Sequence, residues 1–307
     1  MNQISIGAAV ILTVALCGTG TNASAQDNNT VTPTATTAIT KQPVIPTVEQ
    51  LLKSAEKSIA KVKDYTGFMD KQERFLEELG KVEKTKFKFA RPFKVYIKFL
   101  NAYSGREAIF VRGKNDNEVK VHKGTFPDIT VNLDPKGDTA MEGNHHPITD
   151  FGLASTIRIS ARNLRKALKR GDCKFEVSDG GTVNGRPVWK IAATFPKGGY
   201  FVTAKDDETI WDIAKRTGQD MYLILYTNKD KGWDEPDDID EGDKVFIPRY
   251  YGGRAELMVD KETHLPVKAT TWDWAGNLYE MYSYKDIKLN PGLTANDFNP
   301  DNKEYDF

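Results

Sequence analysis

The sequence has no excess of charge of either sign, because 43 Lys and Arg residues balance 43 Asp and Glu residues among 307. Proteins that bind nucleic-acid phosphates usually carry a marked basic excess, so no nucleic-acid partner is expected. Apart from an N-terminal segment that we expect to be removed, no apolar run approaches the roughly 20 residues that span a bilayer. The mature chain is therefore predicted to have no transmembrane segment.

Cysteine is also scarce. Cys17 lies in the N-terminal segment, which leaves Cys173 alone in the mature chain and excludes an intramolecular disulfide there. Burial as a small apolar side chain is the favoured role for Cys173.

Motifs that carry catalysis are missing from the mature chain: we find no phosphate loop, dinucleotide fingerprint, Gly-x-Ser-x-Gly elbow or Cys-His pair. The only dense group of potential metal ligands is His145, His146 and Asp150, and a functional site would need a third histidine, from His122 or His264. Adjacent histidines point in different directions on most backbones. The sequence therefore predicts no enzyme, no cofactor and no metal.

The N-terminus has the pattern of an export signal. An apolar run over Ile4–Leu16 precedes Ala23-Ser24-Ala25, a small-x-small cleavage pattern, so residues 1–25 are predicted to be a signal peptide. Residues 26–46 are rich in Thr and Pro and have few large apolar side chains, which predicts a flexible leader. The protein is expected to be exported to the periplasm or cell envelope.

The sequence of the larger domain predicts two helices. Thr47 and Gln50 form a capping box before an amphipathic pattern that predicts a helix over 48–63. A second pattern predicts a helix over 147–170 that ends at Gly171. Its apolar stripe is Leu153, Ile157, Ala161, Leu164 and Leu168. The basic residues on its other faces are expected to be solvated, with contact to an anionic lipid or wall polymer as the alternative.

Period-two alternation predicts antiparallel strands in the rest of the chain. The alternation is clear at Phe87 and Phe89, and a hairpin is indicated by the runs 108–112 and 118–122. Further strands are expected at 175–177, 188–195, 255–259, 267–272 and 278–284.

Residues 200–249 break this pattern, and Gly pairs at 198–199 and 252–253 bracket them. The order strand, helix, helix, strand is predicted within about fifty residues. This stretch holds thirteen acidic and seven basic residues, so it is acidic while the remainder is basic. Residues 200–249 are therefore predicted to be an inserted domain.

The insert resembles the LysM family. The resemblance rests on Glu208-Thr209-Ile210-Trp211-Asp-Ile213-Ala214, on Asn228, and on the closing Gly242-Asp-Lys-Val-Phe-Ile247-Pro248. It departs from the family at Asp207, where a Gly is usual, and in the longer loop 231–238.

The LysM resemblance implies binding of peptidoglycan or another GlcNAc-containing glycan. The implied contact residues are Asp207, Glu208, Thr209, Ile210, Trp233, Asp238, Ile239, Asp240, Glu241 and Gly242. Trp233 is expected either to stack on a sugar ring or to anchor its loop.

The remaining sequence resembles LolA-like lipoprotein carriers. The residues that carry this resemblance are Arg91-Pro92, the phrase Val259-Asp-Lys-Glu-Thr-His-Leu-Pro-Val267, and the ending Tyr284-Lys-Asp-Ile-Lys-Leu-Asn290 with Phe298. His146–Leu153 also resembles an uncharacterised bacterial branch of that superfamily. The implied fold is α+β, a curved antiparallel half-barrel sheet with covering helices.

The predicted domains are thus a discontinuous LolA-like domain, 47–199 plus 250–300, a LysM domain, 200–249, and a C-terminal tail, 301–307. The resemblance implies a concave apolar face that receives acyl chains. Candidate cavity residues are Phe87, Phe89, Val95, Ile97, Phe99, Trp189, Trp272, Trp274 and Met281. Ordinary core packing is the alternative for each of them.

These patterns favour a non-enzymatic envelope protein that binds peptidoglycan through the insert and a lipid or lipoprotein through the larger domain. A wall-associated scaffold with a filled core, bound to another envelope protein, is the alternative. A wall-remodelling hydrolase would rest only on the many carboxylates, which occur on every solvated surface.

Overall fold

The computed structural model describes residues 44–307. The predicted signal peptide, 1–25, and residues 26–43 of the predicted leader lie outside the described part. Residues 44–307 form a single compact unit. None of the helices in these residues combines the length and apolar character needed to cross a bilayer.

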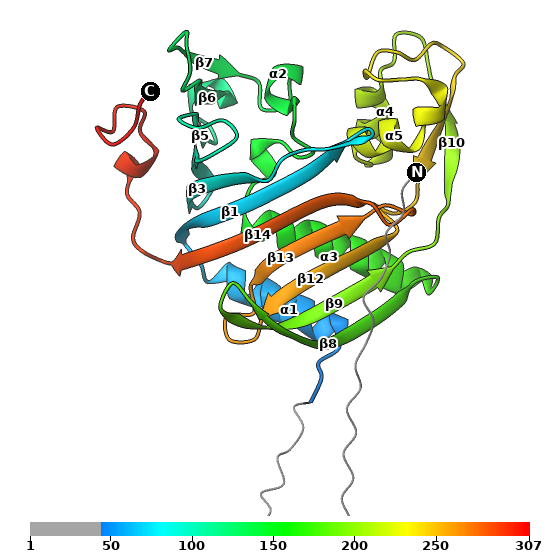
Figure 1. Ribbon diagram of the computed structural model, residues 1–307, viewed down its shortest axis with the longest axis horizontal. Coiled ribbons are helices and arrows are strands. Elements are labelled where there is room, and N and C mark those ends of the chain that lie inside the picture. The colour runs from blue at the N-terminus through cyan, green and yellow to red at the C-terminus, as the bar shows by residue number, and fades with distance from the viewer. Residues whose placement is uncertain (1–43) are drawn as a thin grey trace, which may run out of the picture. The chain divides into compact units, whose positions relative to one another are not determined.

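A large antiparallel sheet dominates the structure (Figure 1). Its strand order, β7-β6-β5-β4-β3-β1-β14-β13-β12-β9-β8, runs from one edge to the other without closing, and β2 pairs only with β1. The strands are β1 (Asp64–Phe75), β2 (Glu78–Leu79), β3 (Glu83–Ala90), β4 (Lys94–Phe99), β5 (Glu107–Val111), β6 (Val119–His122), β7 (Thr130–Leu133), β8 (Lys174–Val183), β9 (Arg186–Thr194), β12 (Arg254–Asp260), β13 (Pro266–Trp272) and β14 (Leu278–Leu289). The α+β prediction with a large antiparallel sheet is therefore confirmed.

The pairing of β1 with β14 joins the first and last strands of the sheet, and it brings Glu73 directly opposite Glu280. Strands alternate their side chains between faces, so one face of the sheet collects the apolar residues of β1, β3 and β4. The lysines of β3 and β4 lie on the other face, as the alternation predicted.

Two helices lie together on one face of the sheet, α1 (Val48–Ala60) and α3 (Leu153–Arg170) (Figure 1). The capping box predicted at Thr47 and Gln50 is present. Apolar residues of both helices pack with β9 and β12 in a core that includes Leu51, Leu52, Ala161, Leu164, Ile191, Leu257 and Val259. A second core cluster, under β1, β3, β4 and β5, includes Tyr65, Phe87, Phe89, Val95 and Phe110.

The predicted helix 147–170 is divided by Gly152. A 3₁₀ turn, η2 (Ile148–Asp150), precedes the break, and α3 begins only at Leu153 because Gly152 has φ +97°. Gly171 ends α3 in the left-handed conformation, as predicted. The predicted stripe is wrong at its last position: Ala167 is fully buried, whereas Leu168 is 40% exposed.

The inserted residues have the predicted order of elements, β10 (Gly199–Thr203), α4 (Ile210–Thr217), α5 (Met221–Thr227) and β11 (Lys244–Pro248). The two strands pair antiparallel as a separate sheet. A 3₁₀ turn, η3 (Lys229–Lys231), follows α5, and an apolar cluster of the insert's own residues fills the space between helices and strands.

The remaining short elements are η1 (Asn115–Asn117), α2 (Asp138–Met141) and η4 (Ala295–Phe298). The predicted tail, 301–307, packs against the sheet. The Tyr305 ring stacks on Tyr96 of β4, with ring centroids 4.0 Å apart, and the Tyr305 hydroxyl donates to the Asp297 carbonyl.

Gly152 sets the start of the helix that covers the sheet, and we expect Gly152→Ala to be costly. A methyl group there would lie 2.3 Å from the Tyr65 hydroxyl oxygen, in addition to the strain of positive φ. The matched control is Gly113→Ala, which has φ +78° and no neighbour within 4 Å. Urea unfolding should show a loss of about 1–2 kcal/mol for the control and about 1–3 kcal/mol more for Gly152→Ala. Equal losses would contradict the predicted contact.

Candidate functional site

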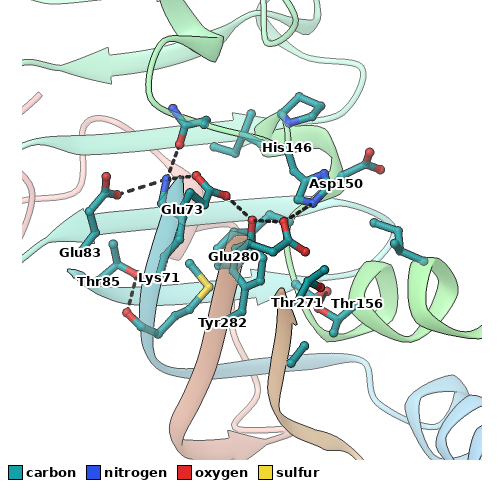
Figure 2. A pocket seen from close by; sticks show the side chains of 18 of the residues that line it. Lys71, Glu73, Glu83, Thr85, His146, Asp150, Thr156, Thr271, Glu280 and Tyr282 are labelled. Carbon is teal, nitrogen blue, oxygen red and sulfur yellow. Dashed lines mark hydrogen bonds and ion pairs between the residues drawn. The ribbon is translucent and has the colours of Figure 1, made fainter. Parts of the chain in front are cut away.

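A cavity of about 270 Å³ lies between the sheet and the segment that leads from β7 into α3 (Figure 2). It is slightly smaller than the roughly 300–1,000 Å³ of common small-molecule sites. The apolar part of its wall comes from the sheet and from the covering segment. These apolar residues include Met69, Ile97, Phe99, Ala108, Val119, Val121, Leu133, Ile148, Phe151 and Ile159.

Only two of the predicted cavity residues, Ile97 and Phe99, line this cavity. Phe87, Phe89 and Val95 face the same side of the sheet but are buried in its core, where the ring of Phe151 covers Phe87 at 5.2 Å. They are therefore core residues, as the alternative held.

The other four predicted cavity residues lie away from the cavity. Strand alternation places Met281 and Trp272 on the opposite face from the cavity-lining Tyr282 and Thr271. Trp189 and Trp274 pack at the margin of the α1–α3 core.

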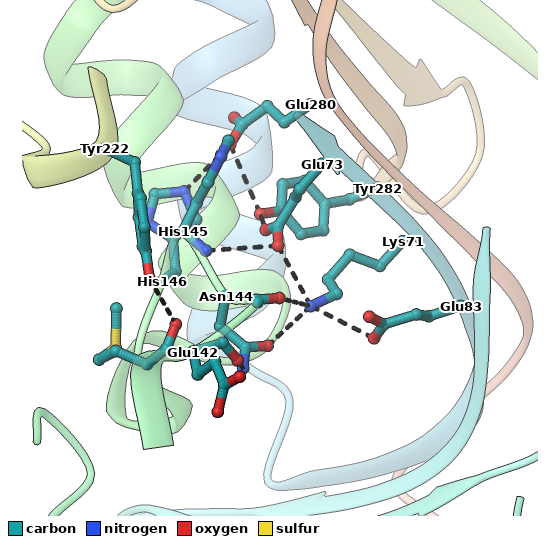
Figure 3. A network of polar contacts seen from close by, with 12 residues as sticks. Lys71, Glu73, Glu83, Glu142, Asn144, His145, His146, Tyr222, Glu280 and Tyr282 are labelled. Carbon is teal, nitrogen blue, oxygen red and sulfur yellow. Dashed lines mark hydrogen bonds and ion pairs between the residues drawn. The ribbon is translucent and has the colours of Figure 1, made fainter. Parts of the chain in front are cut away.

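One end of the cavity is polar and is organised around Lys71 (Figures 2 and 3). The Lys71 ammonium lies 3.1 Å from Glu73 and 3.3 Å from Glu83. It also donates to the Asn144 side chain at 2.7 Å and to the Gly143 carbonyl at 3.2 Å. Burial disfavours its charged form, but the two carboxylates outweigh that effect and raise the pKa of Lys71.

Glu73 is almost completely buried, and its carboxylate has several hydrogen-bond and ion-pair partners. Its carboxylate accepts from the Tyr282 hydroxyl and, at 3.3 Å, from the backbone N–H of His145. Burial opposes its ionisation, but Lys71 and His145 outweigh burial and lower the pKa of Glu73. Glu83 is different, because burial prevails and raises the pKa of its carboxyl.

Glu280 lies opposite Glu73 and is surrounded by donors (Figure 3). The Tyr251 hydroxyl donates to it at 2.8 Å, and the rings of His145 and His146 lie 3.4 and 3.3 Å from the same oxygen. Burial would raise the pKa of Glu280, but the two histidines lower it strongly. Conversely, Glu280 overcomes the burial of His146 and raises its pKa to about 9.

The potential metal ligands noted in the sequence, His145, His146 and Asp150, do not come together as one group. Asp150 forms an ion pair with Arg158 at 2.6 Å, and His122 pairs with Asp128. The structure instead gathers Glu73, His145 and Glu280, whose ligand atoms lie within 4.8 Å of one another. No local pattern in the sequence marks the two glutamates, because they meet only through the pairing of β1 with β14.

Each of the two predicted glycan-contact segments of the insert is hydrogen-bonded to a residue that precedes the other segment. The backbone N–H of Ile210 donates to the Pro236 carbonyl at 2.8 Å, and that of Gly242 donates to the Ala204 carbonyl at 3.0 Å. Five predicted contact residues are exposed, namely Asp207, Asp238, Asp240, Glu241 and Gly242.

The other predicted contact residues are less accessible. Glu208 and Thr209 are half-buried, with Glu208 paired to Arg216 and Thr209 capping α4. Ile210, Ile239 and Trp233 are buried in the insert's core. Trp233 therefore anchors its loop and does not present a ring for a sugar.

The insert also packs against the large sheet through α5. The Tyr222 hydroxyl donates to the Met141 carbonyl at 2.9 Å, and the Tyr226 hydroxyl donates to Asp273. Leu223 and Tyr226 form a buried cluster with Tyr279 of β14. Direct packing and hydrogen bonds thus hold the insert on its host.

Lys71 is the cation nearest to two buried carboxylates, so its removal should be costly. We expect Lys71→Met to lower the free energy of unfolding by about 3–5 kcal/mol, because Glu73 and Glu83 would lose their shared partner. Lys84→Met, on the exposed side of the adjacent strand, is the control and should change stability by less than about 0.5 kcal/mol. Urea unfolding at neutral pH measures both, and equal stability of the two variants would show that the network is not needed.

Comparison with solved structures gives only remote similarity. The structure described as the Pseudomonas aeruginosa MucA/MucB complex is 11% identical with a TM-score of 0.41, and the match covers 81% of this chain and 59% of that one. Across the MucB structures matched, this chain spans about three fifths of their length.

Two smaller proteins are matched over almost their whole length. Mycobacterium tuberculosis lipoprotein LppX is 13% identical, with a TM-score of 0.38 and coverage of 81% and 99%. A LolA superfamily protein from Nitrosomonas europaea is 10% identical, with a TM-score of 0.29 and coverage of 83% and 98%.

The comparison with protein families identifies the family of this chain, whereas the similarity to solved structures is remote. No curated protein matches the chain. The family described as "Protein of unknown function (DUF1571)" matches residues 62–227 and 248–307, which is most of the sequence. The chain therefore belongs to the DUF1571 family.

Proposed function

We propose that this chain is a non-enzymatic cell-envelope protein that binds an acyl chain of a lipid or lipoprotein in the cavity between its sheet and α3. The observation that carries the proposal is the cavity itself, whose lining is rich in apolar side chains and also contains the polar cluster around Lys71. Export, predicted from residues 1–25, is part of the proposal.

An acyl chain suits the apolar wall on energetic grounds. Each methylene removed from water contributes about 0.8 kcal/mol, so ten methylenes would supply about 8 kcal/mol before the costs of association. Lys71 and the nearby carboxylates are already paired with one another, whereas the buried Nε of Arg106 in the cavity lining has no partner in the described part of the chain and is the donor left for a head group. Apolar contact, not head-group recognition, would thus provide most of the affinity.

The alternative of a scaffold with a filled core is less favoured. Ile97, Phe99 and Val121 pack with the core on the apolar face of the sheet, yet they also border the cavity. An interior without a ligand would normally close such a space, because protein cores are close-packed.

Filling the cavity should abolish binding. Ser160 of α3 lines the cavity, so Ser160→Trp is expected to weaken binding of a fluorescent fatty-acid analogue to the delipidated protein at least tenfold. The control is Arg162→Trp, which adds the same ring on the exposed face of α3 and should leave the affinity unchanged. Thermal unfolding of both variants would verify folding. No binding by the unaltered protein, or equal binding by Ser160→Trp, would contradict the proposal.

A second candidate function is glycan binding by the LysM-like insert. It is favoured by two neighbouring segments, Asp207–Ile210 and Asp238–Gly242, which together expose five of the predicted contact residues. With Trp233 buried, recognition would depend on polar side chains and backbone groups. The insert would hold the protein at peptidoglycan while the larger domain binds its ligand.

A bulky side chain between these segments should block a glycan. We expect Asp240→Trp to reduce co-sedimentation of the full chain with purified peptidoglycan at least tenfold, because Asp240 is exposed within the predicted contact surface. Asp230→Trp, exposed on η3 outside that surface, is the control for added hydrophobicity. Equal sedimentation of both variants, or none by the unaltered protein, would refute glycan binding at this surface.

A further inference from the structure

Three buried side chains converge behind the polar end of the cavity. Glu73 comes from β1, Glu280 from β14, and His145 from the segment between α2 and η2. One ligand atom from each lies within 4.8 Å of the other two. From this geometry we propose that Glu73, His145 and Glu280 bind a divalent transition-metal ion, a role that goes beyond acyl binding and does not depend on it.

The hydrogen bonding of His145 fixes which nitrogen faces the glutamates. Its Nε2 lies 2.8 Å from the Arg74 carbonyl oxygen, which can only accept, so Nε2 carries a proton. Nδ1 then faces Glu280 at 3.4 Å. If the imidazole is neutral, a lone pair of Nδ1 faces a carboxylate, and either a proton on Nδ1 or a metal ion between the two groups removes that repulsion. Histidines that bind metals commonly donate their other N–H to a backbone carbonyl in this way.

The spacing of the ligand atoms also suits a metal. Two ligands bound at about 2.0–2.1 Å to a tetrahedral ion lie roughly 3.3–3.4 Å apart. The His145 Nδ1 to Glu280 distance is 3.4 Å, and His146 Nε2 lies 3.3 Å from the same Glu280 oxygen. His146 lies outside the group whose ligand atoms all fall within 4.8 Å of one another, so it is a neighbour of the site and not one of its three protein ligands.

The buried carboxylates of the site need positive partners, and the two histidines beside Glu280 supply them when no metal is bound. A divalent ion would take over this compensation and displace protons from the histidine that ligates it, because an imidazole binds a metal in its neutral form.

The existing contacts can remain when an ion binds. Lys71 keeps Glu83, Asn144 and the Gly143 carbonyl as partners if Glu73 turns toward the metal. The hydroxyls of Tyr282 and Tyr251 donate to Glu73 and Glu280, which orients both carboxylates as outer hydrogen bonds do around known metal sites.

The donor set indicates which kind of metal is bound. Ca²⁺ takes six to eight oxygen ligands, more than this group offers, whereas imidazole with carboxylate suits Zn²⁺ and its transition-metal neighbours. Glu73, Glu280 and His146 line the cavity, so an ion can reach the site from that side.

Zn²⁺ binding by the full chain tests the proposal. After removal of metals with a chelator, competition against a chromophoric zinc indicator should show one Zn²⁺ per chain. Glu280→Gln, which preserves the shape of the side chain, should weaken the affinity at least tenfold. His264→Gln, in the turn between β12 and β13, is the control and should bind as the unaltered protein does.

Co²⁺ provides a readout that does not depend on any variant folding. Added to the metal-free unaltered protein, Co²⁺ should give the intense visible absorption of a tetrahedral site, and Zn²⁺ should abolish it. Absence of both this spectrum and stoichiometric Zn²⁺ binding would overturn the proposal, as would equal affinity of Glu280→Gln and His264→Gln. Neither result would bear on acyl binding.

Discussion

The rest of the structure depends on the close approach of two buried carboxylates. The register of β1 with β14 sets Glu73 directly opposite Glu280, and like charges in such cross-strand positions repel. Leaving a buried charge without a partner costs several kcal/mol. The pairing of the first and last strands therefore requires positively charged groups next to the two carboxylates. Lys71, His145 and His146 provide this compensation, from β1 itself and from the segment that covers the cavity.

This compensation links parts of the molecule that are distant in sequence. The segment that carries His145 and His146 forms one wall of the cavity, and its position is fixed by the two glutamates. The His145 ring also stacks on Tyr279, with centroids 4.5 Å apart, and lies 5.6 Å from Tyr222 of the insert. The same side chain therefore contacts the sheet, the cavity wall and the insert. A displacement of any one of these three parts should shift the position of the other two.

Local patterns in the sequence predicted local structure well. The capping box at Thr47, the helix stop at Gly171 and the strand alternation around Phe87 each depend on residues a few positions apart. The order of elements in the insert was predictable for the same reason. The break at Gly152 was missed, because the helical spacing continues across it while the backbone conformation does not.

The site itself was largely hidden from the sequence. Alternation predicts which face of a strand is apolar but not the depth at which a side chain lies, so Phe87 was assigned to a cavity although it is core. The adjacent histidines are evident in the sequence, but local spacing points to Asp150 and to other histidines as their partners. Glu73 and Glu280 could be found only from strand pairing, which a single sequence does not specify.

Native mass spectrometry of the full chain, purified from its membrane-containing source without delipidation, tests the central claim most directly. The account predicts a population whose mass exceeds that of the polypeptide by one lipid, and collisional activation should release that lipid. The polypeptide mass alone, across repeated preparations and gentle ionisation, would contradict a role for the cavity in acyl binding.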